Sequence, residues 1–114
     1  MKRKFRLTRT TDFKRVRRFG KSYAHPLVVL ITSPNQEMTV HVGVTASRSV
    51  GGAVDRNRAK RRIRACIEPL FPVLRPGWDL IFLARKAILK ADFKDIQATF
   101  ISLLTGAKLL VEDT

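Results

Sequence analysis

Residues 50–65 read V-G-G-A-V-D-R-N-R-A-K-R-R-I-R-A, and this stretch decides both the fold class and the kind of partner. Beyond its two glycines, Ala59, Ile63 and Ile67 recur at the spacing of one α-helical face. The other faces are polar or cationic, with Asn57, Lys60, Arg61 and Arg64 on one flank and Arg58 and Arg62 on another. We therefore predict a helix that buries one side and presents a basic surface on the rest.

The segment before this helix predicts one short basic helix and two strands. Thr10, Thr11 and Asp12 offer a helix N-cap, and Gly20 is placed to end that helix. Residues 23–32 form a β-rich run, and residues 40–45 alternate with the period of two of a half-buried strand. We expect these two strands to pair as a hairpin.

The segment after the basic helix predicts a central strand and a terminal helix. Pro69 and Pro72 should end the basic helix, and residues 78–84 are apolar on both faces, as in a strand covered on both sides. Asp92 is placed as the N-cap of a last amphipathic helix. The order α-β-β-α-β-α predicts an α+β fold, a small mixed β-sheet packed by helices, with residues 1–114 forming a single domain.

The charge of the chain predicts a polyanionic partner. Its formal net charge is +14, from 23 Lys and Arg against 9 Asp and Glu. Ten of the basic residues lie in residues 2–21 and seven more in residues 48–64. The second group is mostly arginine, whose planar fork binds phosphate oxygens in pairs, so structured RNA is favoured over a merely solvated charged face.

Several classes of protein are disfavoured by the sequence. Cys66 is the only cysteine, which leaves no intramolecular disulfide and no thiolate zinc site. The longest clean apolar run, residues 27–31, is too short to span a bilayer, and no secretory signal opens the chain, so we predict a cytoplasmic protein without a membrane partner. His25 and His41 lie apart and the acids are scattered, so we predict no catalytic residue and no protein-held metal.

An ordered set of motifs resembles the bacterial ribonuclease P protein family. The set comprises R-L-T-R-T-T-D-F at residues 6–13, V-G-V-T-A-S at 42–47, R-N-R at 56–58 and W-D-L-I-F-L-A-R at 78–85. The resemblance implies the non-catalytic protein subunit of an endoribonuclease, a hydrolase whose catalytic RNA removes the 5′ leader of precursor tRNA with Mg2+ held mainly by that RNA. It also implies a fold similar to the second domain of ribosomal protein S5, a left-handed βαβ crossover, and no obligate protein partner.

The resemblance also assigns residues to two RNA partners. The catalytic RNA would be bound by Arg48, Arg56, Asn57, Arg58, Lys60, Arg61, Arg62 and Arg64, and the precursor-tRNA leader by Arg9, Phe13, Lys14 and Arg17. Relatives often carry an aromatic at Arg17, a tyrosine at Ile31 and an asparagine at Gly52, so we expect a more electrostatic leader cleft in this chain.

Three alternatives stay open on the sequence alone. Phe13 either stacks on a leader base or anchors its helix to the sheet, while Phe19 is expected in the core or in helix-end packing. A ribosomal protein or RNA chaperone would carry a similar charge, because charge does not name the RNA. A protein-only nuclease is the third alternative, and it requires cleavage of precursor tRNA without any RNA subunit.

Overall fold

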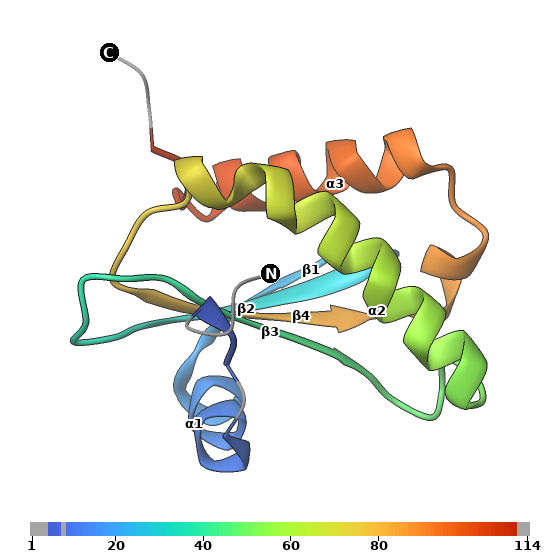
Figure 1. The fold of residues 1–114 in the computed structure, drawn as a ribbon, viewed down its shortest axis with the longest axis horizontal. Helices are drawn as coiled ribbons and strands as arrows, with labels where there is room; N and C mark the ends of the chain where they lie inside the picture. The colour runs from blue at the N-terminus through green and yellow to red at the C-terminus, as the bar shows by residue number, and fades with distance from the viewer. Residues whose placement is uncertain (1–4, 8, 112–114) are drawn as a thin grey trace.

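A four-stranded sheet separates one helix from two others in the computed structural model, which describes residues 5–7 and 9–111 (Figure 1). Helix α1 lies on one face of the sheet, and α2 and α3 lie together on the other. The elements are α1 (Thr10–Phe19), β1 (Lys21–Ala24), β2 (Val28–Pro34), β3 (His41–Ala46), α2 (Ala53–Ile67), the 3-10 helix η2 (Glu68–Val73), β4 (Trp78–Ala84), the 3-10 helix η3 (Lys86–Leu89) and α3 (Phe93–Gly106). The predicted α+β fold with a mixed sheet is confirmed.

The order of the strands is β1-β2-β4-β3, and this corrects the expected hairpin. β4 lies between β2 and β3, antiparallel to the first and parallel to the second, so β2 and β3 do not pair with each other. The run at residues 23–32 is two strands, because the chain turns at His25 and Pro26. Leu27 N–H donates to His25 Nδ1 at 3.1 Å in this turn, and the antiparallel pair β1–β2 follows from it.

β3, α2 and β4 form a parallel crossover. Parallel neighbours need a long connection, and α2 supplies it across the sheet face opposite α1. The left-handed sense implied by the resemblance stays a prediction.

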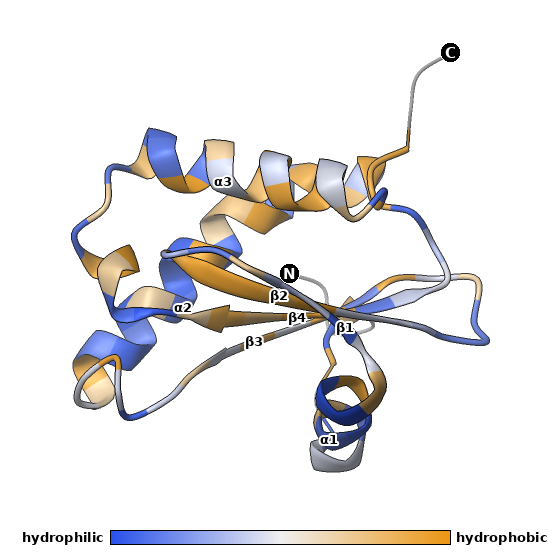
Figure 2. Cartoon of the chain, turned by 180° about the vertical axis from the view of Figure 1, so that it is seen from behind, coloured by the Kyte–Doolittle hydropathy of each residue, from blue (hydrophilic) through white to orange (hydrophobic). Residues whose placement is uncertain are grey.

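Two apolar clusters hold the helices on the sheet. The larger lies under α2 and α3, where the rings of Phe82 and Phe100 stack at 4.8 Å between centroids. The smaller lies under α1 and consists of Leu7, Val16, Ile31 and Ile81, with Phe13, Val29 and Leu83 packed against it. Figure 2 shows the largely hydrophobic central strands β2 and β4 above α1, whose ribbon is hydrophilic along part of its length.

The ends of α1 and α2 agree with the sequence only in part. Arg9, and not Thr10, Thr11 or Asp12, is the N-cap of α1, and it makes no side-chain capping hydrogen bond. Gly20 ends the helix as expected, with its N–H donating to the Val16 carbonyl at 2.8 Å. α2 stops at Ile67, and the two prolines that follow fall in η2.

The sequence pattern also predicted the places of two helix-end residues, Phe19 and Asp92. The Phe19 side chain is 72% exposed at the last turn of α1, so it is not in the core, one of its two expected places. Asp92 is the N-cap of α3, as expected, although its side chain makes no capping hydrogen bond.

Candidate RNA-binding surfaces

The outer side of α2 is the larger basic surface. Ala59, Ile63, Cys66 and Ile67 are buried against the core, so the arginine-rich faces of the helix point away from it. Asn57, Arg58 and Arg61 are exposed, while Arg56, Lys60, Arg62 and Arg64 are half-buried and Arg48 is exposed in the turn before the helix. All but one of the residues expected to bind the catalytic RNA thus come from a single helix.

A shallow hollow on this helix brings four side chains together. Val54, Asn57, Arg61 and Arg64 line it, at the spacing of one helical face. Two donors in this region, Arg56 Nε and Arg64 Nε, are buried without an acceptor among the described residues. An oxygen-rich ligand such as a phosphate carries acceptors for guanidinium groups of this kind.

Arg62 differs from the other arginines of α2. Its Nη2 donates to the main-chain carbonyl of Ala91, in the segment that leads into α3. Arg62 therefore ties α2 to the start of the terminal helix, a structural contact that the sequence did not predict.

The N-terminus of α2 carries an acid as well as free N–H groups. Gly51 has φ +148°, which favours glycine, and a Cβ built there would lie 2.6 Å from Asp55 Oδ2. Asp55 thus lies against the start of its own helix, where a negative charge is favourable. A phosphate at this N-terminus would meet that carboxylate.

The second basic surface lies beside α1. Thr10, Phe13, Lys14, Arg17, Val44 and Thr45 line a depression of about 420 Å³ between α1 and β3, which we call the α1–β3 hollow. Phe13, Lys14 and Arg17, three of the four residues expected to bind the leader, lie there together. Arg17 follows Phe13 by four positions and Lys14 by three, the spacings of neighbours on a helix surface, which explains the grouping.

Phe13 has the anchoring role and also lines the hollow. Its ring packs on the sheet at Gly43 of β3, where an added Cβ would lie 2.6 Å from Phe13 Cζ. The side chain is half-buried, so part of the ring faces the hollow. Whether the ring stacks on a base stays a prediction.

Arg9 is separated from the other three predicted leader residues. It lines a different hollow of about 590 Å³, together with Arg6, Arg15, His41 and Asp79, and we call this the Asp79 hollow. Arg9 precedes α1, so its position does not follow the helical spacing that groups Phe13 with Arg17.

Two basic residues that the sequence pattern did not single out extend the α1–β3 hollow. Arg85 and Lys86 follow β4 directly, are exposed, and line a depression of about 540 Å³ that shares Arg17 and Thr45 with the α1–β3 hollow. The sequence feature that could have identified them is a pair of basic residues directly after a central strand, because the ends of neighbouring strands lie close together there.

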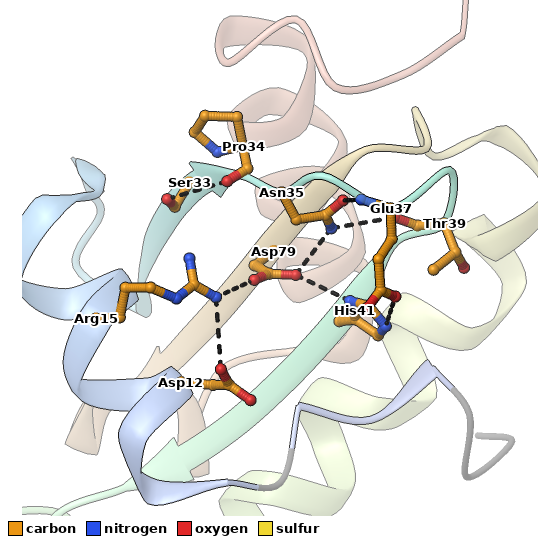
Figure 3. Close-up of polar contacts among 9 residues, drawn as sticks. All are labelled: Asp12, Arg15, Ser33, Pro34, Asn35, Glu37, Thr39, His41 and Asp79. Atoms are coloured by element: carbon orange, nitrogen blue, oxygen red, sulfur yellow. Dashed lines mark hydrogen bonds and ion pairs between the residues drawn. The ribbon is translucent and has the colours of Figure 1, made fainter.

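A polar network around Asp79 was also missed. Asp79 is 2% exposed and accepts hydrogen bonds from Arg15 Nη2, Asn35 Nδ2 and His41 Nδ1 (Figure 3). His41 Nε2 lies 3.2 Å from Glu37 Oε2, and Arg15 Nη2 lies 3.7 Å from Asp12 Oδ1. Burial alone would raise the pKa of Asp79, but the three donors outweigh it and the net shift of this pKa is downward.

Among the described residues, no three His, Cys, Asp or Glu side chains are grouped so that they could hold a metal ion. No helix in the described part of the chain is long and apolar enough to cross a membrane.

Comparisons with known proteins identify relatives of this chain. A family model described as Ribonuclease P matches residues 1–108. A ribonuclease P protein component of Herpetosiphon aurantiacus is 39% identical over 109 residues, which cover 96% of this chain and 89% of that protein.

Solved structures match as well. An RNase P protein mutant of Staphylococcus aureus "with defective mRNA degradation activity" has a TM-score of 0.85 at 30% identity, covering 94% of this chain and 91% of that one. The RNase P protein of Thermotoga maritima has a TM-score of 0.79 at 26% identity, covering 89% and 96%. With the whole fold and nearly the whole sequence matched, the chain belongs to the ribonuclease P protein family.

Proposed function

We propose that this chain is the RNA-binding protein subunit of a ribonuclease P ribonucleoprotein that processes tRNA. In this proposal a catalytic RNA removes the 5′ leader of precursor tRNA, and the protein binds and positions both RNAs. The basic faces of α2 bind the catalytic RNA, and the α1–β3 hollow, continued by Arg85 and Lys86, binds the single-stranded leader. Family membership supports the subunit role.

The observation that carries the leader assignment is the grouping of Phe13, Lys14 and Arg17 in one hollow. An aromatic ring beside two cations is the combination that binds single-stranded nucleic acid, because the ring stacks on a base while the cations neutralise phosphates. Helix α1, which lines the hollow, lies on the sheet face opposite α2, so the two RNAs would meet different sides of the protein.

Mg2+ would be held by the RNA in this proposal. Among the described residues no three His, Cys, Asp or Glu side chains are grouped into an all-protein cage, and Mg2+ commonly takes most of its ligands from phosphates and water. Asp79, the buried carboxylate, already accepts from three side chains and is not free for a cation. The work of the protein is therefore electrostatic and positional, and it lowers the repulsion between leader and catalytic RNA.

Two rival functions remain distinguishable by experiment. A ribosomal protein would follow the ribosome through a sucrose gradient, whereas the proposed subunit should co-purify with one large RNA and restore 5′ cleavage at low Mg2+. A protein-only nuclease would cleave precursor tRNA without RNA, and loss of that activity on substituting a carboxylate would overturn the proposal.

The leader assignment is tested with Arg17→Ala in a reconstituted holoenzyme. Affinity is measured for precursor tRNA with its leader and for mature tRNA. Arg17 is exposed, so losing its contact with a phosphate, about 1 kcal/mol, should weaken precursor binding about fivefold and leave mature tRNA unchanged. Equal weakening for both RNAs would contradict leader binding in the hollow.

Arg18→Ala is the matched control. Arg18 is the next residue of the same helix and is also exposed, but it does not line the α1–β3 hollow. Arg18→Ala removes the same charge from α1 as Arg17→Ala does. An equal effect of the two substitutions would mean that overall charge, and not the hollow, determines leader affinity.

A further inference from the structure

Asp79 is a buried charge that the proposed RNA contacts do not use. It begins the face of β4 that α1 covers, on which Ile81 and Leu83 follow at alternate positions. A carboxylate at 2% exposure is strongly unfavourable unless hydrogen bonds satisfy it. The presence of this carboxylate in an apolar strand therefore indicates that the side chains hydrogen-bonded to it have a structural role.

Those partners come from three separate elements. Arg15 lies on α1 and donates to Oδ2, whereas Asn35 of the β2–β3 loop and His41 of β3 both contact Oδ1, at 2.9 and 3.0 Å (Figure 3). Asn35 also donates to the Thr39 carbonyl at 3.2 Å, which holds the loop in place. Asp79 thus joins α1 to a rigid end of the sheet.

Arg15 holds the flank of α1 that faces away from the α1–β3 hollow. It lies two residues from Phe13 and two from Arg17, so at 3.6 residues per turn it points about 160° from each. One side of α1 therefore contacts Asp79, and the opposite side forms a wall of the hollow.

Few other contacts fix the position of α1 across the sheet. Of its ten residues only Val16 is buried, with Phe13 half-buried beside it. Apolar contacts are non-directional, and they resist sliding along the sheet less than a hydrogen-bonded ion pair does. Main-chain bonds anchor the segments before and after α1, and the Arg15–Asp79 pair is the side-chain hydrogen bond that ties the helix itself to the sheet.

We propose that Asp79 and Arg15 are positioning residues, which set the width of the α1–β3 hollow and thereby the affinity for single-stranded RNA without touching it. This inference rests on the proposed function, because it concerns the same hollow. The inference adds a pair of specificity-determining residues, Arg15 and Asp79, on the side of α1 that faces away from the α1–β3 hollow.

The test uses Asp79→Asn and Arg15→Gln in the reconstituted holoenzyme. The measured quantity is the preference for leader-bearing precursor over mature tRNA, at a temperature where circular dichroism shows every variant to be folded. We expect this preference to fall about fivefold to tenfold, at least as much as on removing the Arg17 side chain. Arg15→Lys, which keeps the charge, should retain more of the preference than Arg15→Gln.

Leu104→Ala is the control for destabilisation. Leu104 is buried in α3 on the other side of the sheet, so its truncation lowers stability without changing α1. It should leave the preference unchanged. A fall in preference in Leu104→Ala equal to that in Asp79→Asn would mean that general stability, and not the position of α1, is being measured, and would overturn the proposal.

The position of α1 is also measured directly. Spin labels on Arg18→Cys of α1 and Gln97→Cys of α3, both exposed sites, report the distance between the helices. Cys66 should stay unlabelled, because burial raises the pKa of its thiol to about 11. Asp79→Asn should shift or broaden the distance distribution, whereas Leu104→Ala should not.

Unchanged preference and an unchanged distance in Asp79→Asn and Arg15→Gln would overturn the positioning role. Arg17→Ala, measured in parallel, separates this failure from that of the proposed function. If Arg17→Ala lowers the preference and the Asp79 variant does not, only the positioning role fails. If neither does, the leader assignment fails.

Discussion

Gly43→Ala should force Phe13 away from the sheet. A Cβ on Gly43 would lie 2.6 Å from Phe13 Cζ, 2.9 Å from Phe13 Cε1 and 3.3 Å from Leu7 Cβ. The ring packs against the cluster under α1, so relieving the contact means turning the ring toward the α1–β3 hollow or moving α1. Overpacking of this kind costs about 1 to 3 kcal/mol, and the gain from replacing a strand glycine offsets about 0.5 kcal/mol of it.

The size of the effect can be checked by thermal unfolding. With about 2.1 cal/mol/K of unfolding entropy per residue, 114 residues give about 0.24 kcal/mol/K, so a net destabilisation of about 0.5 to 2.5 kcal/mol lowers Tm by about 2 to 10 °C. Gly106→Ala is the matched control, since no heavy atom lies within 4 Å of its added Cβ. That variant should raise Tm slightly, because alanine favours the helix.

A double-mutant cycle assigns the destabilisation to the ring. In a Phe13→Ala background the clash partner is absent, so Gly43→Ala should be close to neutral in the free energy of unfolding. An equal destabilisation in both backgrounds would refute the reasoning, because the added methyl group would then be clashing with something other than Phe13.

Three further predictions concern charges and a strained residue. The folded-state pKa of Asp79 is lowered, so its contribution to stability is present above pH about 4 and is lost as pH falls through the folded pKa. In urea unfolding between pH 6 and pH 2, the free energy of unfolding should therefore fall less steeply with acidification in Asp79→Asn than in the unmutated protein. Arg58→Ala should make the plot of log affinity for the catalytic RNA against log salt concentration less steep. The slope should fall in magnitude by about 0.7 to 0.9 for each phosphate that the protein no longer neutralises. Its control is Arg75→Ala, which should leave that slope unchanged, because Arg75 is exposed outside α2 and lines none of the hollows described above. Lys108 has φ 60°, so Lys108→Gly should raise the free energy of unfolding by about 0.5 to 1 kcal/mol in chemical denaturation.

The elements with a clear period were predictable from the sequence, and the pairing of strands was not. α2 and β4 follow from apolar spacing and from an apolar run bounded by turn residues. The spacing of apolar residues does not show which strands lie next to each other in the sheet, so the position of β4 between β2 and β3 was not predicted. The turn at Pro26 was hidden inside a run whose composition is β-rich throughout.

The two RNA surfaces were predictable to the extent that one helix builds them. Phe13 and Arg17 share a flank because they are four residues apart, and α2 carries its arginines for the same reason. Arg9 lies outside the helix and lines another hollow, so helical spacing does not place it beside them, and its contact with the leader stays a prediction. The Asp79 network was missed because its contacts span 64, 44 and 38 residues of sequence, and only the folded sheet brings them together.

The place of β4 between β2 and β3 also has a consequence during synthesis. The N-terminal part of a chain emerges first, so until Ala84 has emerged only the β1–β2 ladder can form, and β3 has no neighbour in the sheet. Unpaired apolar strands invite association between copies, and late non-local pairing prolongs that state. Ten basic residues in positions 2–21 give each growing chain a like charge that opposes such contacts. Lys14 and Arg17, which are proposed to bind RNA, are among these ten, so they would oppose association of nascent copies before the α1–β3 hollow has formed.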